Sequence, residues 1–131
     1  MSYAEAFQCF LKHCDQRQQL FTWLSTQTDR FRSVKRFLSI GSGTGICEKE
    51  LIRYMPNLEL VAVVEPNSDF ILELKHNLTG SYHLQTHAVT YEQTQLDGPY
   101  DLIMFSHSLY YLPDRHKIID DCYHRLLSPH G

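Results

Sequence analysis

The segment 37–52 begins as an apolar run, passes through Gly41, Gly43 and Gly45, and continues with apolar residues at helical spacing. Pro56 ends the helical pattern, because proline lacks the amide hydrogen that a helix interior needs. Glycine adopts backbone conformations that other residues avoid, and it lets a ligand lie directly against the main chain. The segment therefore predicts a strand, a tight loop and a helix, with the loop as a candidate ligand site.

The same alternation of strand and helix patterns continues along the chain. The run 58–67, "LELVAVVEPN", is almost continuously apolar, as is typical of a strand buried on both faces of a parallel sheet. Residues 68–78 have helical spacing, residues 82–87 and 99–106 predict two more strands, and residues 114–127 predict a final helix. Because strands alternating with helices form right-handed βαβ units, we expect an α/β fold with an open, mostly parallel sheet and helices on both faces.

The segment before the first predicted strand carries apolar residues at three- and four-residue spacing, which predicts a leading amphipathic helix over residues 3–24. These residues are Phe7, Phe10, Leu11, Cys14, Phe21 and Leu24. A chain of 131 residues has the size of one domain. We expect a single domain over 1–131, in which 1–30 form a leading helix that caps the substrate site.

Charge and composition narrow the classes of partner. The formal net charge of −3 gives no basic field for nucleic acid or an anionic membrane surface. The four cysteines form no C-x-x-C pair, and no apolar run approaches the roughly 20 residues that span a bilayer. His83 and His87 fall in a predicted strand, where their spacing does not suit a shared metal. We therefore expect a cytoplasmic chain that binds a small molecule and no nucleic acid, membrane or metal.

The loop and the second strand together indicate the ligand. Lys49 does not stand in the register of a phosphate-binding P-loop, and Ile46 replaces the third glycine of the dinucleotide fingerprint. Glu65 ends the second strand, where a carboxylate can accept hydrogen bonds from both ribose hydroxyls. The pattern predicts a nucleoside ligand, and an ordinary strand-to-helix turn remains the structural alternative.

Three segments, "LSIGSGTG", "VVEPN" and "YDLIMFSHSLYYL", have the order and spacing of motifs in class I S-adenosylmethionine-dependent methyltransferases. The chain resembles that family over nearly its whole length, and most of all its histamine N-methyltransferase type. Shared features are Ser39 in place of an acidic residue, the Glu65-Pro66 pair, and the run from Leu109 to Tyr111. The resemblance implies a Rossmann-like fold and transfer of a methyl group from S-adenosyl-L-methionine to a small molecule, at an amine nitrogen.

The resemblance also implies roles for individual residues. The implied cofactor-binding residues are Gly41, Ser42, Gly43, Gly45, Glu65, Pro66, Asn67, Thr90 and Ser106. The implied substrate-binding residues are Gln16, His107, Tyr110 and Tyr111. His107 is the expected catalytic residue, because histidine can accept a proton from an amine near neutral pH. Gln16 stands where the histamine type has an acidic residue that holds the amine, which argues against histamine as the acceptor.

Two alternatives remain open. One is a nonenzymatic or inactive nucleoside-binding module, since the pattern stops after the fourth strand and its helix; the other is an NAD-dependent oxidoreductase, which Ile46 disfavours. Members of the resembled family continue beyond the fourth strand, so we expect a sheet truncated there, with the edge at "LIMF" carrying unpaired backbone groups. We expect the chain either to be a fragment of a longer enzyme or to self-associate through that edge.

Overall fold

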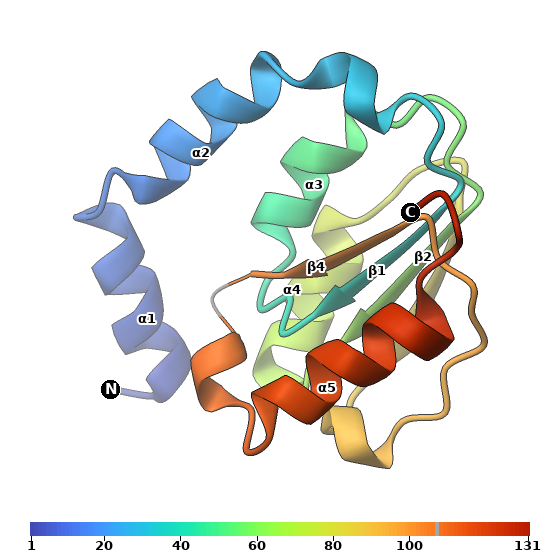
Figure 1. The fold of residues 1–131 in the computed structure, drawn as a ribbon. Coiled ribbons are helices and arrows are strands. Elements are labelled where there is room, and N and C mark those ends of the chain that lie inside the picture. Colours follow the sequence, from blue (N-terminus) through green and yellow to red (C-terminus); the bar gives the residue numbers. More distant parts are fainter. Residues whose placement is uncertain (107) are drawn as a thin grey trace.

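The computed structural model describes residues 1–106 and 108–131, and it shows one parallel sheet of four strands (Figure 1). The strands are β1 (Arg36–Ile40), β2 (Leu60–Val64), β3 (His83–His87) and β4 (Leu102–Phe105). Their spatial order is β3-β2-β1-β4, so β3 and β4 are the outer strands of the described sheet. The predicted open parallel α/β fold is confirmed.

The register of the sheet brings the carboxyl ends of all four strands to one edge. Ile40 at the end of β1 pairs with Val64 of β2 and with Phe105 of β4, and Val64 also pairs with His87 of β3. The loops that follow these residues must therefore meet at the same edge. Ligands of open α/β sheets bind at such an edge, so the register places the predicted site residues near one another.

Helices cover both faces of the sheet (Figure 1). On one face α3 (Ile46–Ile52) and α4 (Ser68–Asn77) pack on Phe37 of β1 and on β2. On the other face α5 (Arg115–Asp121) packs on the alternate residues of β1 and β2. The predicted final helix does not stay α-helical throughout, because a π-helical turn over Cys122–Leu126 follows α5.

The predicted single leading helix is wrong, because residues 3–24 form two helices joined at a bend (Figure 1). Helix α1 spans Tyr3–Lys12 and α2 spans Gln16–Ser25. Asp15 precedes α2 and its carboxylate accepts a hydrogen bond from Gln19 Nε2 at 2.7 Å. The break lets α2 bury Leu24 in the core while α1 packs elsewhere. None of the helices in the described part of the chain is long and apolar enough to cross a membrane.

Candidate functional site

The glycine loop connects β1 to α3, and its three glycines have positive φ angles but different surroundings. A Cβ on Gly41 would lie 2.2 Å from the Cβ of Ser108, whose hydroxyl donates to the Ile40 carbonyl at 2.6 Å. A Cβ on Gly43, at φ +56°, would meet no atom within 4 Å. Gly41 is therefore required by internal packing, whereas Gly43 faces open space. Gly45 precedes α3, and a Cβ there would lie 3.3 Å from Leu74 of α4 and 3.2 Å from Leu78, which follows α4.

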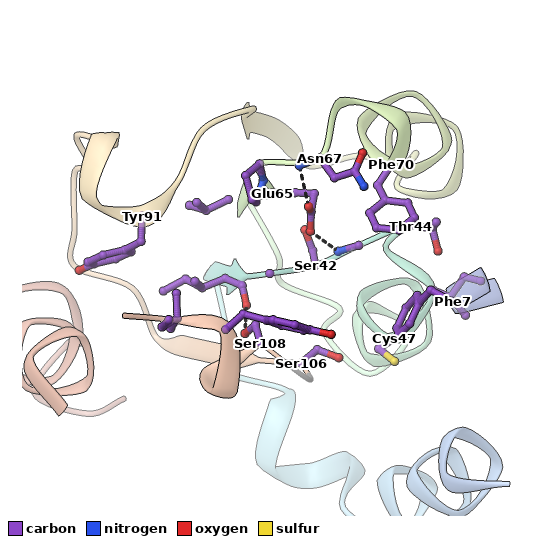
Figure 2. Close-up of a pocket in the computed structure, with 18 of the residues that line it drawn as sticks. Phe7, Ser42, Thr44, Cys47, Glu65, Asn67, Phe70, Tyr91, Ser106 and Ser108 are labelled. Atoms are coloured by element: carbon purple, nitrogen blue, oxygen red, sulfur yellow. Dashed lines mark hydrogen bonds between the residues drawn. The ribbon is translucent and has the colours of Figure 1, made fainter. Parts of the chain in front are cut away.

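Glu65 ties this loop to the segment after β2 (Figure 2). Glu65 is only 6% exposed, and its carboxylate accepts the backbone N–H of Gly43 at Oε2 and that of Asn67 at Oε1, each at 2.8 Å. A carboxylate oxygen has two lone pairs, so each oxygen can still accept from a ligand. Glu65 can therefore hold the loop and bind a hydroxyl group at the same time.

A cavity of about 350 Å³ lies at the carboxyl edge of the sheet. It is lined by most of the residues that the sequence predicts for the cofactor and substrate: Gln16, Gly41, Ser42, Gly43, Glu65, Pro66, Asn67, Thr90, Ser106 and Tyr111. Gly45 packs against α4 instead, and Tyr110 is 59% exposed. His107 lies outside the described residues. The volume falls within the range of small-molecule sites, roughly 300 to 1,000 Å³.

Aromatic residues that sequence reasoning missed form a wall of the cavity. Tyr3 and Phe7 of α1 lie with their ring centroids 6.3 Å from the ring of Phe70 on α4. The Tyr3 hydroxyl donates to that of Tyr111 at 3.0 Å, and this bond, together with burial, raises the pKa of Tyr3 to about 12. Helical spacing signalled the apolar position of Phe7, but spacing alone does not distinguish a core residue from a cavity wall.

A fully buried carboxyl joins β1 to α3, the two elements that the glycine loop connects. Ser39 and Glu48 are both 0% exposed, and the Ser39 hydroxyl donates to Glu48 Oε1 at 2.6 Å. Oε2 of Glu48 has no hydrogen-bond partner in the described part of the chain. Burial raises the pKa of Glu48 to about 7, although the bond from Ser39 acts in the opposite direction. The acidic group of Glu48 on α3 thus lies beside Ser39, near the end of β1.

Polar residues gather at another part of the cavity wall. Cys47, at the start of α3, lines the cavity with Ser106 and with Arg17 of α2. Burial and the nearby Glu48 raise the pKa of the Cys47 thiol, while Ser106 and Arg17 act in the opposite direction. The cavity therefore combines an aromatic wall, a loop of exposed backbone and a small polar region.

Comparison with known proteins agrees with this geometry. Residues 38–131 match the model of a family described as a methyltransferase domain. The fold is similar to that of the plantazolicin methyltransferase BpumL in complex with a monoazolic desmethylPZN analog and SAH, with a TM-score of 0.67 and 16% identity. That match covers 87% of this chain but 46% of that one, so the chain spans about half the length of this methyltransferase.

Two further solved structures have the same fold. The N-methyltransferase NodS from Bradyrhizobium japonicum WM9 matches with a TM-score of 0.66 and 21% identity, covering 88% of this chain and 66% of that one. The amino pentose methyltransferase CalS10 from Micromonospora echinaspora matches with a TM-score of 0.55 and 20% identity, covering 71% and 39%. No curated protein sequence matches the chain significantly.

Proposed function

The chain belongs to the family of methyltransferase domains, and from this premise we propose that it transfers a methyl group from S-adenosyl-L-methionine to a small-molecule acceptor, at an amine nitrogen. The observation that carries the proposal is the glycine loop held by Glu65 at the rim of the cavity. The N-methyltransferase NodS, which has the same fold, supports nitrogen as the acceptor atom.

The residues at the strand ends fit the methyl donor. Gly43 leaves open space where any other residue would place a Cβ, and the Ser42 hydroxyl is buried without a partner among the described residues. Glu65 presents a carboxylate at the position expected to accept hydrogen bonds from ribose hydroxyls. We infer that the loop residues and Glu65 hold the nucleoside, with Asn67 and Thr90 also in the wall. When bound, the donor supplies an electrophilic methyl group on a cationic sulfur.

The chain contributes position and exclusion of water. In methyl transfer the acceptor atom must approach the methyl carbon in line with the breaking bond to sulfur. Orientation of the two reactants in a cavity without water therefore supplies much of the rate acceleration. Tyr3 and Phe7 bring α1 over the cavity, and the bond from Tyr3 to Tyr111 joins α1 to the segment after β4. These residues would hold an apolar acceptor away from water. The free cysteines suit a reducing compartment, and we propose the cytoplasm.

Calorimetric titration tests the proposed cofactor. We expect S-adenosylmethionine and S-adenosylhomocysteine to bind and NAD not to bind. Binding of NAD alone would refute the proposal in favour of an oxidoreductase. Methyl transfer to a panel of amines then tests the reaction, and binding of the donor without transfer to any acceptor would favour the nonenzymatic alternative.

We propose His107 as the proton acceptor for the amine. His107→Ala should depress turnover while leaving the affinity for S-adenosylhomocysteine within about a factor of three. His116→Ala, on an exposed position of α5, is the matched control and should leave turnover unchanged. This assignment is wrong if His107→Ala has normal turnover, or if its main effect is a loss of affinity for S-adenosylhomocysteine.

The two glycines at the start of the loop should respond differently to alanine. Gly43→Ala should weaken binding of S-adenosylhomocysteine by roughly tenfold, because the new methyl group occupies space left for the ligand, while the left-handed backbone costs about 1–2 kcal/mol of stability. Gly41→Ala should mainly lower the free energy of unfolding, because its Cβ would overlap Ser108. Calorimetry and urea denaturation on both variants measure the contrast. Equal effects on binding and stability in the two variants would contradict it.

A further inference from the structure

Glu48 is a buried carboxyl group that lies close to the cavity without being exposed to it. It belongs to the first turn of α3 and is 0% exposed, although Ile46 and Cys47, just before it, line the cavity. The Ser39 hydroxyl donates to one of its oxygens, and the other has no hydrogen-bond partner in the part of the chain that the structure describes. A charge that is removed from water and only partly paired costs free energy, so the ionisation of Glu48 is sensitive to other charges nearby.

The charged groups that act on Glu48 lie in the cavity wall. Burial is the largest influence and raises the pKa of Glu48 to about 7; Glu65 acts in the same direction, and Arg17 of α2 acts in the opposite direction. Both Glu65 and Arg17 line the cavity. A charge inside the cavity would therefore act on Glu48 as these two residues do.

The other elements around Glu48 leave it to these two charges. The charged residues of α4, the second helix packed against α3, are exposed, and Leu74 of α4 and Leu78 after it face the start of α3. On α3 itself Lys49 is exposed, and the carboxylate of Glu50 accepts from Arg53. The remaining titratable neighbour is the Cys47 thiol, whose pKa is raised by burial and by Glu48.

The proposed methyl donor and its product differ in charge at one atom. S-adenosylmethionine carries a positive sulfonium sulfur, and S-adenosylhomocysteine has a neutral thioether in its place. A cation in a cavity of low dielectric stabilises an ionised carboxyl nearby and lowers its pKa, whereas a neutral thioether does not. A carboxyl that is half ionised near neutral pH, as Glu48 is, therefore responds to the one group whose charge changes in the reaction.

We propose that Glu48 is a specificity-determining residue, which ionises when the cationic donor binds and so favours the donor over its neutral product. Glu48 releases its proton to the solvent as S-adenosylmethionine binds. It takes a proton back from the solvent once the methyl group has left and the sulfur is neutral. The Ser39 hydroxyl supports the ionised form by donating to Oε1. The proposal rests on the proposed methyltransferase function, and it requires no contact between Glu48 and the ligand.

The first test measures the affinities of S-adenosylmethionine and S-adenosylhomocysteine by calorimetry at pH 5.5 and pH 8, for the wild type and for Glu48→Gln. Lowering the pKa of Glu48 by about 1 makes the ionised chain bind the cation tenfold more tightly than the protonated chain does. The preference for the donor should therefore rise roughly five- to tenfold more in the wild type than in Glu48→Gln. The amino groups of the ligands titrate alike with both chains and cancel in this comparison. Glu73→Gln, at an exposed position of α4, is the matched control and should behave as the wild type does.

A second variant keeps the carboxyl and so tests the proposal even if Glu48→Gln does not fold. Ser39→Ala removes a hydrogen bond that favours the ionised form of Glu48. Its pKa should rise, and the increase in preference for the donor should move to higher pH than in the wild type. Urea denaturation identifies the variants that are folded.

The outcomes separate this inference from the proposed function. A preference that changes with pH in the same way in the wild type and in every folded variant refutes the role of Glu48 and leaves the proposed function intact. A smaller rise in Glu48→Gln, or a shift to higher pH in Ser39→Ala, supports it. A wild-type chain that binds neither nucleoside at either pH would refute the proposed function itself, and the role of Glu48 with it.

Discussion

Glu65→Ala should weaken binding of S-adenosylhomocysteine by roughly a hundredfold, or about 3 kcal/mol. The substitution removes the expected acceptor for two ribose hydroxyls, and hydrogen bonds to a charged acceptor contribute about 1.5–3 kcal/mol each. It also removes the acceptor for the Gly43 and Asn67 N–H groups, so the glycine loop loses its tie to β2. Calorimetric titration of the folded variant measures the loss.

Two further variants separate these contributions. Glu65→Gln keeps one acceptor oxygen but places an NH₂ group against one of the two backbone donors, so we expect a loss of affinity in this variant as well. Glu92→Ala removes a different carboxylate from the cavity wall and controls for charge alone. A folded Glu65→Ala variant with wild-type affinity would show that Glu65 only organises the loop.

The parts of the fold that the sequence predicted are those with local patterns. The apolar run of β2 is buried along its whole length, and a strand buried on both faces requires helices on both sides. The glycine loop and Glu65 were identifiable for the same reason, because a strand end is a defined position in an open α/β sheet. Because the strands are parallel, their carboxyl ends lie at one edge of the sheet, so these positions can be predicted to lie together without knowing how the side chains pack.

The break in the leading helix had no such local signal. Cys14 and Phe21 are seven residues apart, so the apolar spacing continues across the bend as it would along one helix. The bend follows from tertiary packing: α2 buries Leu24 in the core, and α1 packs Tyr3 and Phe7 against Phe70. The aromatic wall of the cavity escaped prediction because its members come from separate elements.

Glu48 shows a different limit of sequence reasoning. On an amphipathic helix a glutamate is expected on the exposed face, and Glu48 instead lies fully buried beside Ser39. The short side chain of Ser39 on β1 donates its hydroxyl to the Glu48 carboxylate, which reaches β1 from α3. The burial of the Glu48 carboxyl is explained only when Ser39 and Glu48 are considered as a pair.

Glu48→Gln should change how the stability of the chain depends on pH. The carboxyl has a pKa of about 7 in the folded chain and of about 4.5 when unperturbed. Between these values the folded chain keeps a proton that the unfolded chain releases, so the free energy of unfolding falls as pH rises from about 4.5 to 7. The full difference corresponds to about 3 kcal/mol. Glutamine does not titrate, and its carbonyl can still accept the bond from Ser39.

Urea denaturation of both chains at pH 5 and pH 8 measures the effect, because the other titrating groups are common to the two and cancel in the difference. Relative to the wild type, Glu48→Gln should gain about 2–3 kcal/mol between pH 5 and pH 8, slightly less than the full difference because pH 5 lies above the unperturbed pKa. Its buried NH₂ group, placed where Oε2 has no partner, lowers the stability of the variant at both pH values and so does not alter this change. Glu73→Gln, on the exposed side of α4, removes one carboxylate without burial and is the matched control. Parallel stability curves for Glu48→Gln and the wild type would show that Glu48 is already ionised in the folded chain at pH 5, held so by groups around it despite its burial.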